Sequence, residues 1–403
     1  MTASGRAAVL AEAERVLRQN WHQGEHAGRQ YSYTEPSPGR YPWQWYWDSC
    51  FAAIVWRRFD PARARAELES LLEAQRPNGF VGHTIFWRAP VTFPRLAFYN
   101  VATRRGFLQT ETIQPPLLAW AWKIAVGDPA AEPRIGLHLD WLSEERDLEG
   151  DGLLWIVQPD ESGLDASPKF EEVWGQRANG RLGFPLLVRA NRRLGFNARR
   201  LRDRGRPLLC ETLVNTLWSL SLQAAGRPSA TPALVERLWD ERRGLFVDEA
   251  QPGTLRPQTV TWSSLAPLAL PDLPEAIGRR LVEEHLLNER EFLTPVAPPS
   301  VSVSEPSYEP DGGRGPIRRY WRGPTWVNSA WLVWLGLRRL GYEDEARRLA
   351  DGVVDAAARE GLREYYDPRT GKGLGAKDFA WSALVAEMAD PDEGGPGVIC
   401  SGK

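Results

Sequence analysis

Cysteine and long apolar runs are scarce in this sequence, and each shortage excludes a class of protein. The 403 residues include three cysteines, Cys50, Cys210 and Cys400, which lie far apart without a CxxC pair. That spacing argues against a disulfide framework and against a zinc site. No segment is apolar over the length of a membrane span, and residues 1–20 lack the apolar core of a signal peptide. We therefore expect a cytoplasmic protein.

An excess of charge is also lacking. The formal net charge is −2 at pH 7, so nothing favours nucleic acid or an anionic membrane as a partner. The glycine-rich run 311–316 has neither the Lys-Ser/Thr pair nor the preceding strand of a phosphate-binding loop. The half calcium loop 147–152 lacks the bidentate glutamate at its twelfth position, where Gln158 stands, and we interpret it as a turn that ends a helix. We expect no metal and no organic cofactor.

Segments with helical period recur along the chain and are of two kinds. Buried helices are apolar nearly all round, and this pattern marks residues 48–59, 114–126, 211–225, 262–270, 328–340 and 379–388. Amphipathic, charged segments occupy residues 4–20, 61–75, 133–145, 231–242, 274–287 and 342–360. The two kinds alternate six times, outer then inner, which predicts an all-α (α/α)6 barrel whose few strands are confined to short hairpins.

Three long loops, 76–113, 148–207 and 290–327, separate these helices. Each leads from an outer helix to an inner one, so all three should crowd one mouth of the barrel, and loops of this length are usually functional. No linker divides the chain. We expect one domain over residues 1–389, with 148–207 forming part of the cap, and a flexible tail over 390–403. The outer helices could pair two copies into a homodimer.

Tryptophan is abundant, with 19 residues beside 10 tyrosines and 13 phenylalanines. Indole faces stack on the C–H faces of sugar rings while the indole N–H can donate a hydrogen bond, although tryptophan also fills cores. Four clusters of aromatic and polar residues stand just before or near inner helices, at 41–48, 114–116, 321–328 and 363–368. They predict a deep aromatic cup with a few carboxylates, suited to a neutral polyol.

Two acidic residues from distant loops are candidates for chemistry in this cup. Asp165 follows Gly163 in a turn that can hold an acidic side chain in a fixed pose, and Glu364 precedes a Tyr-Tyr pair. Cleavage of a glycosidic bond needs two carboxyls, one to protonate the leaving oxygen and one to activate water or attack carbon. The pair fits that need, although 52 acidic residues offer many other pairs.

Taken in order, these motifs resemble glycoside hydrolase family 63, in particular its short bacterial mannosylglycerate and glucosylglycerate hydrolases, over residues 41–384. The resemblance implies an inverting hydrolase that releases a hexose and glycerate, with Asp165 of Glu-Ser-Gly-Leu-Asp as general acid and Glu364 as general base. It also implies glycone binding by Asp48 of the Trp-x-Trp-Asp motif, by Gln114 of Gln-Pro-Pro and by Trp326 of Trp-Arg-Gly-Pro-Thr-Trp.

The remaining candidates in the cup are Tyr41, Trp45, Trp47, His83 and Trp321. Arg199, with Tyr320, is the candidate for holding the carboxylate of the acceptor, because an arginine fork binds a carboxylate through two parallel hydrogen bonds. Arg199 lies in an arginine-rich stretch, which weakens this assignment.

Several of these residues could instead have purely structural roles. Asp165 could cap a turn, Glu364 could be a solvated charge, Asp48 could be a helix N-cap, and Gln114 suits a helix start. A lone histidine such as His83 is more often structural. Glu161 could orient Asp165 or pair with an arginine, and we do not expect it to be catalytic.

Three other functions remain open at this point. One is an α-glucosidase or trehalase acting on small α-glucosides. A sugar 2-epimerase also uses such a barrel, but it needs paired basic groups in the cavity, usually histidines, and this chain has five histidines in all. A non-catalytic sugar-binding protein would keep the aromatic cup without needing two carboxyls.

Overall fold

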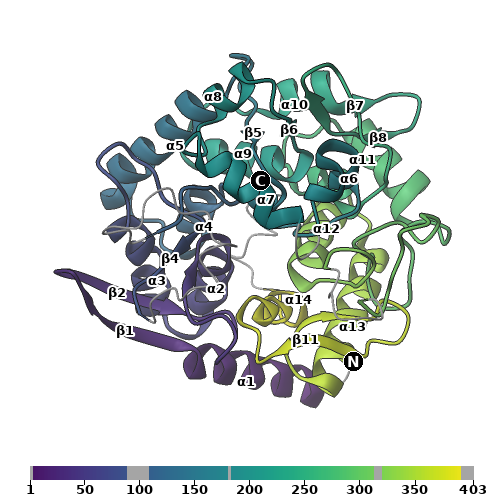
Figure 1. The fold of residues 1–403 in the computed structure, drawn as a ribbon. Coiled ribbons are helices and arrows are strands. Elements are labelled where there is room, and N and C mark those ends of the chain that lie inside the picture. Colours follow the sequence, from purple (N-terminus) through teal and green to yellow (C-terminus); the bar gives the residue numbers. More distant parts are fainter. Residues whose placement is uncertain (1–2, 89–108, 180–182, 313–319, 392–403) are drawn as a thin grey trace.

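The computed structural model describes residues 3–88, 109–179, 183–312 and 320–391. Helices dominate this part of the chain, and Figure 1 shows them arranged in sequence order around a common centre. The first helix, α1 (Ala3–Gln19), contacts the last two, α13 (Glu343–Glu360) and α14 (Val385–Ala389), so the arrangement closes on itself. No helix among the described residues is both long and apolar enough to cross a membrane. Most of the expected tail, residues 392–403, lies outside the described residues.

The six apolar segments predicted from the sequence form an inner ring of helices. Each contacts the next, and the last contacts the first, in the order α2 (Tyr46–Phe59), α4 (Leu118–Ala125), α9 (Thr212–Ala224), η5 (Trp262–Ala269), α12 (Val327–Arg339) and η7 (Ala380–Leu384). The fourth and sixth elements are 3₁₀ helices instead of α-helices, and the sixth is continued by α14. The fourth element is the longer of the two. It contains Pro267, which has no N–H to donate within an α-helix.

The amphipathic segments form the outer helices. These are α1, α3 (Pro61–Glu73), α5 (Glu132–Arg146), α10 (Thr231–Leu238), α11 (Glu275–Arg280) continued by the π-helical turn η6 (Leu281–Leu286), and α13. Helix α3 shows why such a segment starts where it does. Pro61 occupies its first turn, and the Asp60 carboxylate accepts a hydrogen bond from the Arg63 amide as an N-cap.

The segment 148–207, expected as a loop, contains short helices. They are η3 (Pro159–Ser162), α6 (Lys169–Trp174), η4 (Gly175–Arg177), α7 (Gly183–Arg192) and α8 (Ala198–Asp203). All but α7 are shorter than two helical turns, too short to show a full amphipathic period. The turn after α5 is confirmed, because Asp147 accepts hydrogen bonds from the amides of Gly150 and Gly152. One further short helix, η2 (Pro129–Ala131), leads into α5.

The strands are short and pair antiparallel, as expected. The longest hairpin joins β1 (Trp21–His26) to β2 (Arg29–Thr34) and protrudes from the ring in Figure 1. The other strands are β3 (Gln44–Trp45), β4 (Thr84–Ile85), β5 (Trp155–Ile156), β6 (Leu208–Cys210), β7 (Trp239–Asp240), β8 (Leu245–Phe246), β9 (Glu249–Gln251), β10 (Arg363–Tyr366) and β11 (Gly373–Lys377). Most of these strands lie in the connections between one helix and the next.

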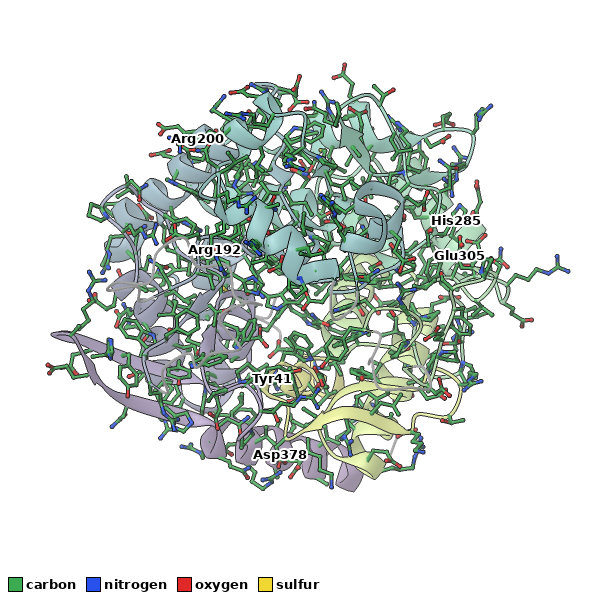
Figure 2. The ribbon with its side chains drawn as sticks, viewed as in Figure 1. Tyr41, Arg192, Arg200, His285, Glu305 and Asp378 are labelled. Carbon is green, nitrogen blue, oxygen red and sulfur yellow. The ribbon has the colours of Figure 1, made fainter. Side chains whose placement is uncertain are left out.

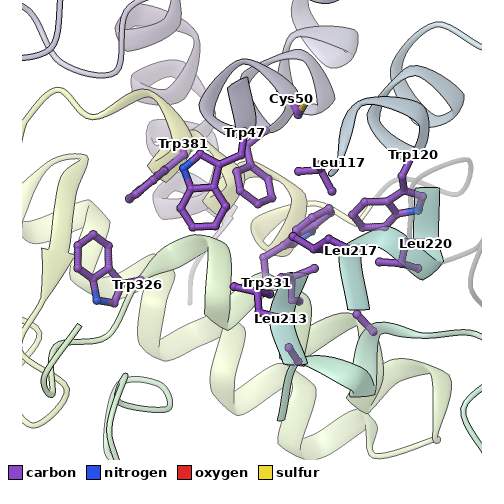
Figure 3. Packing of buried hydrophobic residues seen from close by; sticks show 14 of the residues in the cluster. Trp47, Cys50, Leu117, Trp120, Leu213, Leu217, Leu220, Trp326, Trp331 and Trp381 are labelled. Carbon is purple, nitrogen blue, oxygen red and sulfur yellow. The ribbon is translucent and has the colours of Figure 1, made fainter. Parts of the chain in front are cut away.

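The interior of the ring is a packed core. Trp331 of α12 lies in its middle and contacts Phe51 of α2 edge-on, with ring centroids 6.2 Å apart, and Trp120 of α4 at 5.5 Å. Figure 3 shows Trp331 and Trp120 packed beside Leu217 of α9. Side chains from opposite helices therefore fill the centre of the ring.

Candidate active site

A pocket of about 100 Å³ opens at one end of the ring. It is lined by every residue that the sequence put forward except Arg199, together with four others: Pro36, Tyr41, Trp45, Trp47, Asp48, His83, Gln114, Gly163, Asp165, Tyr320, Trp321, Trp326, Glu364, Phe379 and Trp381. Each of the three long loops contributes lining residues, so the expectation that these loops meet at one mouth is confirmed. The pocket combines three carboxyls with a largely aromatic wall.

The first turn of α2 forms one side of the pocket. The amide of Tyr46 donates to the carbonyl of His83 at 3.0 Å, and the amide of Trp47 donates to Oε1 of Gln114 at 2.9 Å. These bonds satisfy donors that a helix N-terminus otherwise leaves unpaired. Gln114 therefore has a structural role as well as a place in the pocket.

Asp48 lies in the first turn of α2 and is not its N-cap, a position that Trp45 holds. The residue as a whole is 4 % exposed. Burial, with the nearby negative charges of Glu364 and Asp165, raises the pKa of Asp48 well above its usual range. Burial also lowers the pKa of His83 to about 3, so its imidazole is neutral at physiological pH.

The turn that carries Asp165 is anchored by a buried ion pair. Arg146 of α5 donates two hydrogen bonds of 2.6 Å to the carboxylate of Glu161, which also accepts from the amides of Ile113 and Val157. Glu161 is fully buried and Arg146 nearly so. Glu161 thus pairs with an arginine, one of the two roles considered for it, and holds the start of the turn.

Asp165 itself faces the pocket. Its side chain is exposed to solvent in the pocket. The protein atoms around the carboxyl, and then the negative charge of Glu364, disfavour its charged form and raise the pKa of Asp165 to about 7. Near neutral pH, a substantial share of this carboxyl therefore keeps its proton.

Glu364 reaches the pocket from β10, at an irregularity in the pairing of β10 with β11 between Arg363 and Tyr365. Such bulges re-aim side chains. Oε2 accepts a hydrogen bond from the Ala376 amide at 2.8 Å, and Oε1 accepts from the Tyr41 hydroxyl at 3.0 Å. Hydrogen bonds donated to a carboxylate favour its charged form. Glu364 is buried, so it is not a solvated surface charge.

Stacked indole rings form a further wall of the pocket. Trp321 and Trp326 lie parallel at 8°, with ring centroids 3.9 Å apart, and Trp326 meets Trp381 edge-on at 5.6 Å. Trp47 also contacts Trp381 edge-on, at 5.5 Å, and Figure 3 shows Trp47, Trp381 and Trp326 on the same side of the ring. The backbone of Trp321 has φ +51°, a conformation that is strained for a bulky side chain and common at functional sites.

Arg322 joins this wall to the turn of Asp165. Its buried side chain donates from Nε to the carbonyl of Ala166 at 2.9 Å and forms an ion pair with Glu171. Ala166, which directly follows Asp165, has φ +62°. The arginine therefore holds the residue next to Asp165 in a strained conformation, at a fixed place relative to Trp321.

Arg199 is the exception among the predicted residues. It lies exposed on α8 and donates to the carbonyl of Glu144 on α5 at 2.6 Å. Figure 2 shows its neighbour Arg200 at the outer edge of the ring, far from Tyr41. The structure does not bring Arg199 to the pocket, because α8 packs on the outside of α5, and we do not retain it as a ligand of the acceptor.

Four lining residues escaped the sequence argument. Phe379 and Trp381 stand at the start of the last inner helix. Asp48 and Trp326 were predicted because aromatic and polar residues at the start of an inner helix should line the cup, and the same argument applies to Phe379 and Trp381. Gly163 lies inside the recognised motif of Asp165 but was interpreted only as turn punctuation. No motif or pattern in the sequence pointed to Pro36 as a lining residue.

A larger hollow of about 550 Å³ lies elsewhere, between the β1–β2 hairpin and helices α3 and α4. Its charged side chains are already paired, Arg134 with Glu73 at 3.0 Å and Arg65 with Glu69 at 3.6 Å. It holds a single tryptophan, Trp122. We therefore assign the candidate site to the smaller, aromatic pocket.

Gly163 should not tolerate a side chain. Its φ is +72°, and an added Cβ would lie 2.5 Å from the ring of Trp47. We expect Gly163→Ala to lose about 1 kcal/mol to backbone strain and roughly 1–3 kcal/mol more to overpacking. Gly150→Ala is the matched control, because Gly150 has φ +75° and open space around it. Thermal unfolding measures both, and equal losses would contradict the close approach of Gly163 to Trp47.

Comparisons with known proteins identify the family of this chain. The family model of the mannosylglycerate hydrolase MGH1-like glycoside hydrolase domain matches residues 41–382. A mannosylglycerate hydrolase from Rubrobacter radiotolerans is 30% identical over 94% of this chain and 95% of its own length. A glucosylglycerate hydrolase from Mycolicibacterium hassiacum is 27% identical over 87% of this chain and 92% of its own.

The fold agrees as well. The crystal structure of the family 63 mannosylglycerate hydrolase from Thermus thermophilus, in complex with Tris and D-glycerate, superposes with a TM-score of 0.77. It is 25% identical, and the match covers 94% of this chain and 99% of that one. The chain is therefore a glycosidase that belongs to glycoside hydrolase family 63, among its mannosylglycerate hydrolase MGH1-like members.

Proposed function

We propose that this enzyme hydrolyses 2-O-α-mannosylglycerate or the corresponding glucosylglycerate to a hexose and glycerate, with inversion. The observation that carries the proposal is the difference between two carboxyls in one pocket. The pKa of Asp165 is raised to about 7 by the protein atoms around it and by Glu364, whereas Glu364 accepts two hydrogen bonds. Hydrogen bonds of this kind favour a charged carboxylate. Carboxyls whose environments separate their protonation states suit a general acid and a general base.

In the proposed reaction, Asp165 donates its proton to the bridging oxygen as the bond from that oxygen to the anomeric carbon breaks. A water molecule forms a bond to the same carbon from the opposite face and gives a proton to Glu364. Asp48 and the neutral His83 would bind hydroxyls of the sugar. Trp326 lines the pocket beside them.

The relatives support the choice of substrate. They include hydrolases named for mannosylglycerate and for glucosylglycerate, and a crystal structure that contains D-glycerate. Tyr320 lines the pocket and is retained as a ligand of the acceptor. We further propose that residues 1–389 form one (α/α)6-barrel domain, supported by the closed ring of inner helices, with 148–207 as part of its cap. The cytoplasmic location and the homodimer remain predictions.

Proton NMR of the enzyme with α-mannosylglycerate and α-glucosylglycerate, taken separately, tests this function. Release of the β-hexose first, before mutarotation, is expected from at least one of them. Release of the α-hexose first would make the enzyme retaining and remove Glu364 as a base. Cleavage of trehalose or maltose alone would keep the two carboxyls and overturn the acceptor.

The pKa of Asp165 predicts the basic limb of the pH profile. Since Asp165 must carry a proton to act as the acid, kcat/KM on a hexosylglycerate should fall as the pH rises through about 7. An α-hexosyl fluoride is the matched control substrate, because fluoride leaves without a proton and its hydrolysis should not show this limb. An identical limb with both substrates would assign it to another group.

A further inference from the structure

A line of three hydrogen bonds connects Arg40 to Glu364. Nη2 of Arg40 donates to the hydroxyl of Tyr320 at 2.8 Å, the hydroxyls of Tyr320 and Tyr41 are 2.8 Å apart, and the Tyr41 hydroxyl donates to Oε1 of Glu364 at 3.0 Å. The guanidinium of Arg40 also lies over the ring of Tyr41, 5.3 Å from its centroid.

The direction of every bond in this line follows from the number of protons. A tyrosine hydroxyl has one proton, and that of Tyr41 points to Glu364. Tyr41 must therefore accept from Tyr320, which uses its own proton for this bond. Tyr320 in turn accepts from Arg40. All three bonds point the same way, from the cation to the carboxylate.

Arg40 itself does not line the pocket, whereas Tyr41, Tyr320 and Glu364 do. Its side chain is half-buried behind the two tyrosines. Arg40 therefore acts on the pocket from behind the tyrosines, both through their hydroxyls and through the attraction between its charge and Glu364. Burial, with the charge of Glu364, raises the pKa of both tyrosines, so both keep the proton that the line requires.

We propose that Arg40 is a positioning residue that orients the Tyr320 and Tyr41 hydroxyls toward Glu364 and thereby keeps Glu364 ionised. Hydrogen bonds that follow one another polarise each other, and a cation at the far end strengthens the donation to the carboxylate. The inference rests on the proposed role of Glu364 as the base.

The other charged groups near Glu364 make such support necessary. Asp48 on α2 and Asp165 on its turn both face Glu364 with carboxyls, whose negative charge disfavours a third ionised carboxyl. Arg363, adjacent in sequence, donates a hydrogen bond from its guanidinium to the carbonyl of Gly375. Within the described part of the chain, Arg40 is a cation that a continuous line of hydrogen bonds joins to Glu364.

Two variants test the proposal by titration of Glu364 itself. Carboxyl-labelled glutamate gives a carbon NMR signal for Glu364, assigned by its absence from the Glu364→Gln spectrum. Arg40→Met removes the charge and keeps the bulk, and we expect the midpoint of this signal to rise by about 0.5–1 pH unit. Arg40→Lys should restore most of the shift. An unchanged midpoint in Arg40→Met would overturn the proposal.

The matched control is Arg63→Met. Arg63 also rests on aromatic rings, 5.1 Å from the centroid of Trp21 and 5.0 Å from that of Trp56, but it lies outside the pocket. This change should leave the midpoint where it is in the unmodified enzyme. An equal rise in this variant would mean that the loss of any arginine moves the signal, and would overturn the assignment to Arg40.

Kinetics give the second measurement. In Arg40→Met, the acid limb of kcat/KM for an α-hexosyl fluoride should move up with the carboxyl midpoint, so that activity on that limb falls about three- to tenfold. A limb that stays in place, with KM raised only for hexosylglycerates, would instead show that Arg40 binds the acceptor directly. If no sugar is cleaved but the carboxyl midpoint rises, the proposed function fails and the link from Arg40 to Glu364 stands.

Discussion

Replacing Glu364 by glutamine is expected to lower kcat for hexosylglycerate hydrolysis by about 10²–10⁴-fold, the range for loss of a general base. Glutamine keeps the size of the side chain and can still accept the hydrogen bond that the Ala376 amide now gives to Oε2. It cannot take a proton from water. Steady-state kinetics measure the loss, and an unchanged melting temperature shows that the fold is intact.

Asp165→Asn is the companion variant. It should lose a similar factor on a hexosylglycerate, because the leaving alkoxide then departs without a proton. On an α-hexosyl fluoride, Asp165→Asn should retain much of the activity while Glu364→Gln retains little, since only the base is needed there. Equal losses of the two variants on the fluoride would contradict the separate roles of the two carboxyls.

Removing Arg146 is expected to give a large loss of stability. Arg146→Met leaves the buried carboxylate of Glu161 without its cation, and breaking a buried pair in this way costs about 3–5 kcal/mol in the free energy of unfolding. Activity should fall as well, because Glu161 holds the amides of Ile113 and Val157 beside the turn of Asp165. Urea unfolding measures the change.

The control for this prediction is Arg347→Met. Arg347 pairs with Asp344 at 2.9 Å, but both side chains are largely exposed, at 66% and 87%. Such a surface pair contributes about 0–1 kcal/mol. A second test is the double variant Arg146→Met/Glu161→Gln, which should be less destabilised than the sum of its two single changes, because no buried charge remains unpaired. Additive losses would show that the two side chains act independently.

Local sequence predicted the helices well where they are long and repeat a pattern. Segments 46–59 and 327–339 are apolar on nearly every face, and both are inner helices within a few residues of the expected ends. The helix predicted over 262–270 is present as η5, but it is a 3₁₀ helix with Pro267 inside it. The short helices α6 and α8, of six residues each, were missed. Short helices are fixed by tertiary contacts more than by their own pattern.

The candidate site was predicted to the extent that its residues stand in local motifs. Asp48, Asp165 and Trp326 each lie where a loop meets an inner helix or inside a recognisable run, and the pocket collects them. Arg199 had only its charge in its favour. Whether an arginine faces the pocket or the outside depends on how α8 packs on α5, and no residue near it in the chain shows that.

By itself, the sequence determined the alternation of buried and amphipathic helices and the aromatic character of the mouth, because these features depend on residue type and on spacing along the chain. It also proposed Asp165 and Glu364 as the two catalytic carboxyls, through the resemblance of their motifs to a known family. Tertiary structure alone decided the raised pKa of Asp165, the hydrogen bonds to Glu364 and the line that reaches it from Arg40. Each of these depends on distances between groups that lie far apart in the chain, 323 residues for Tyr41 and Glu364, because electrostatic and hydrogen-bond energies follow separation in space.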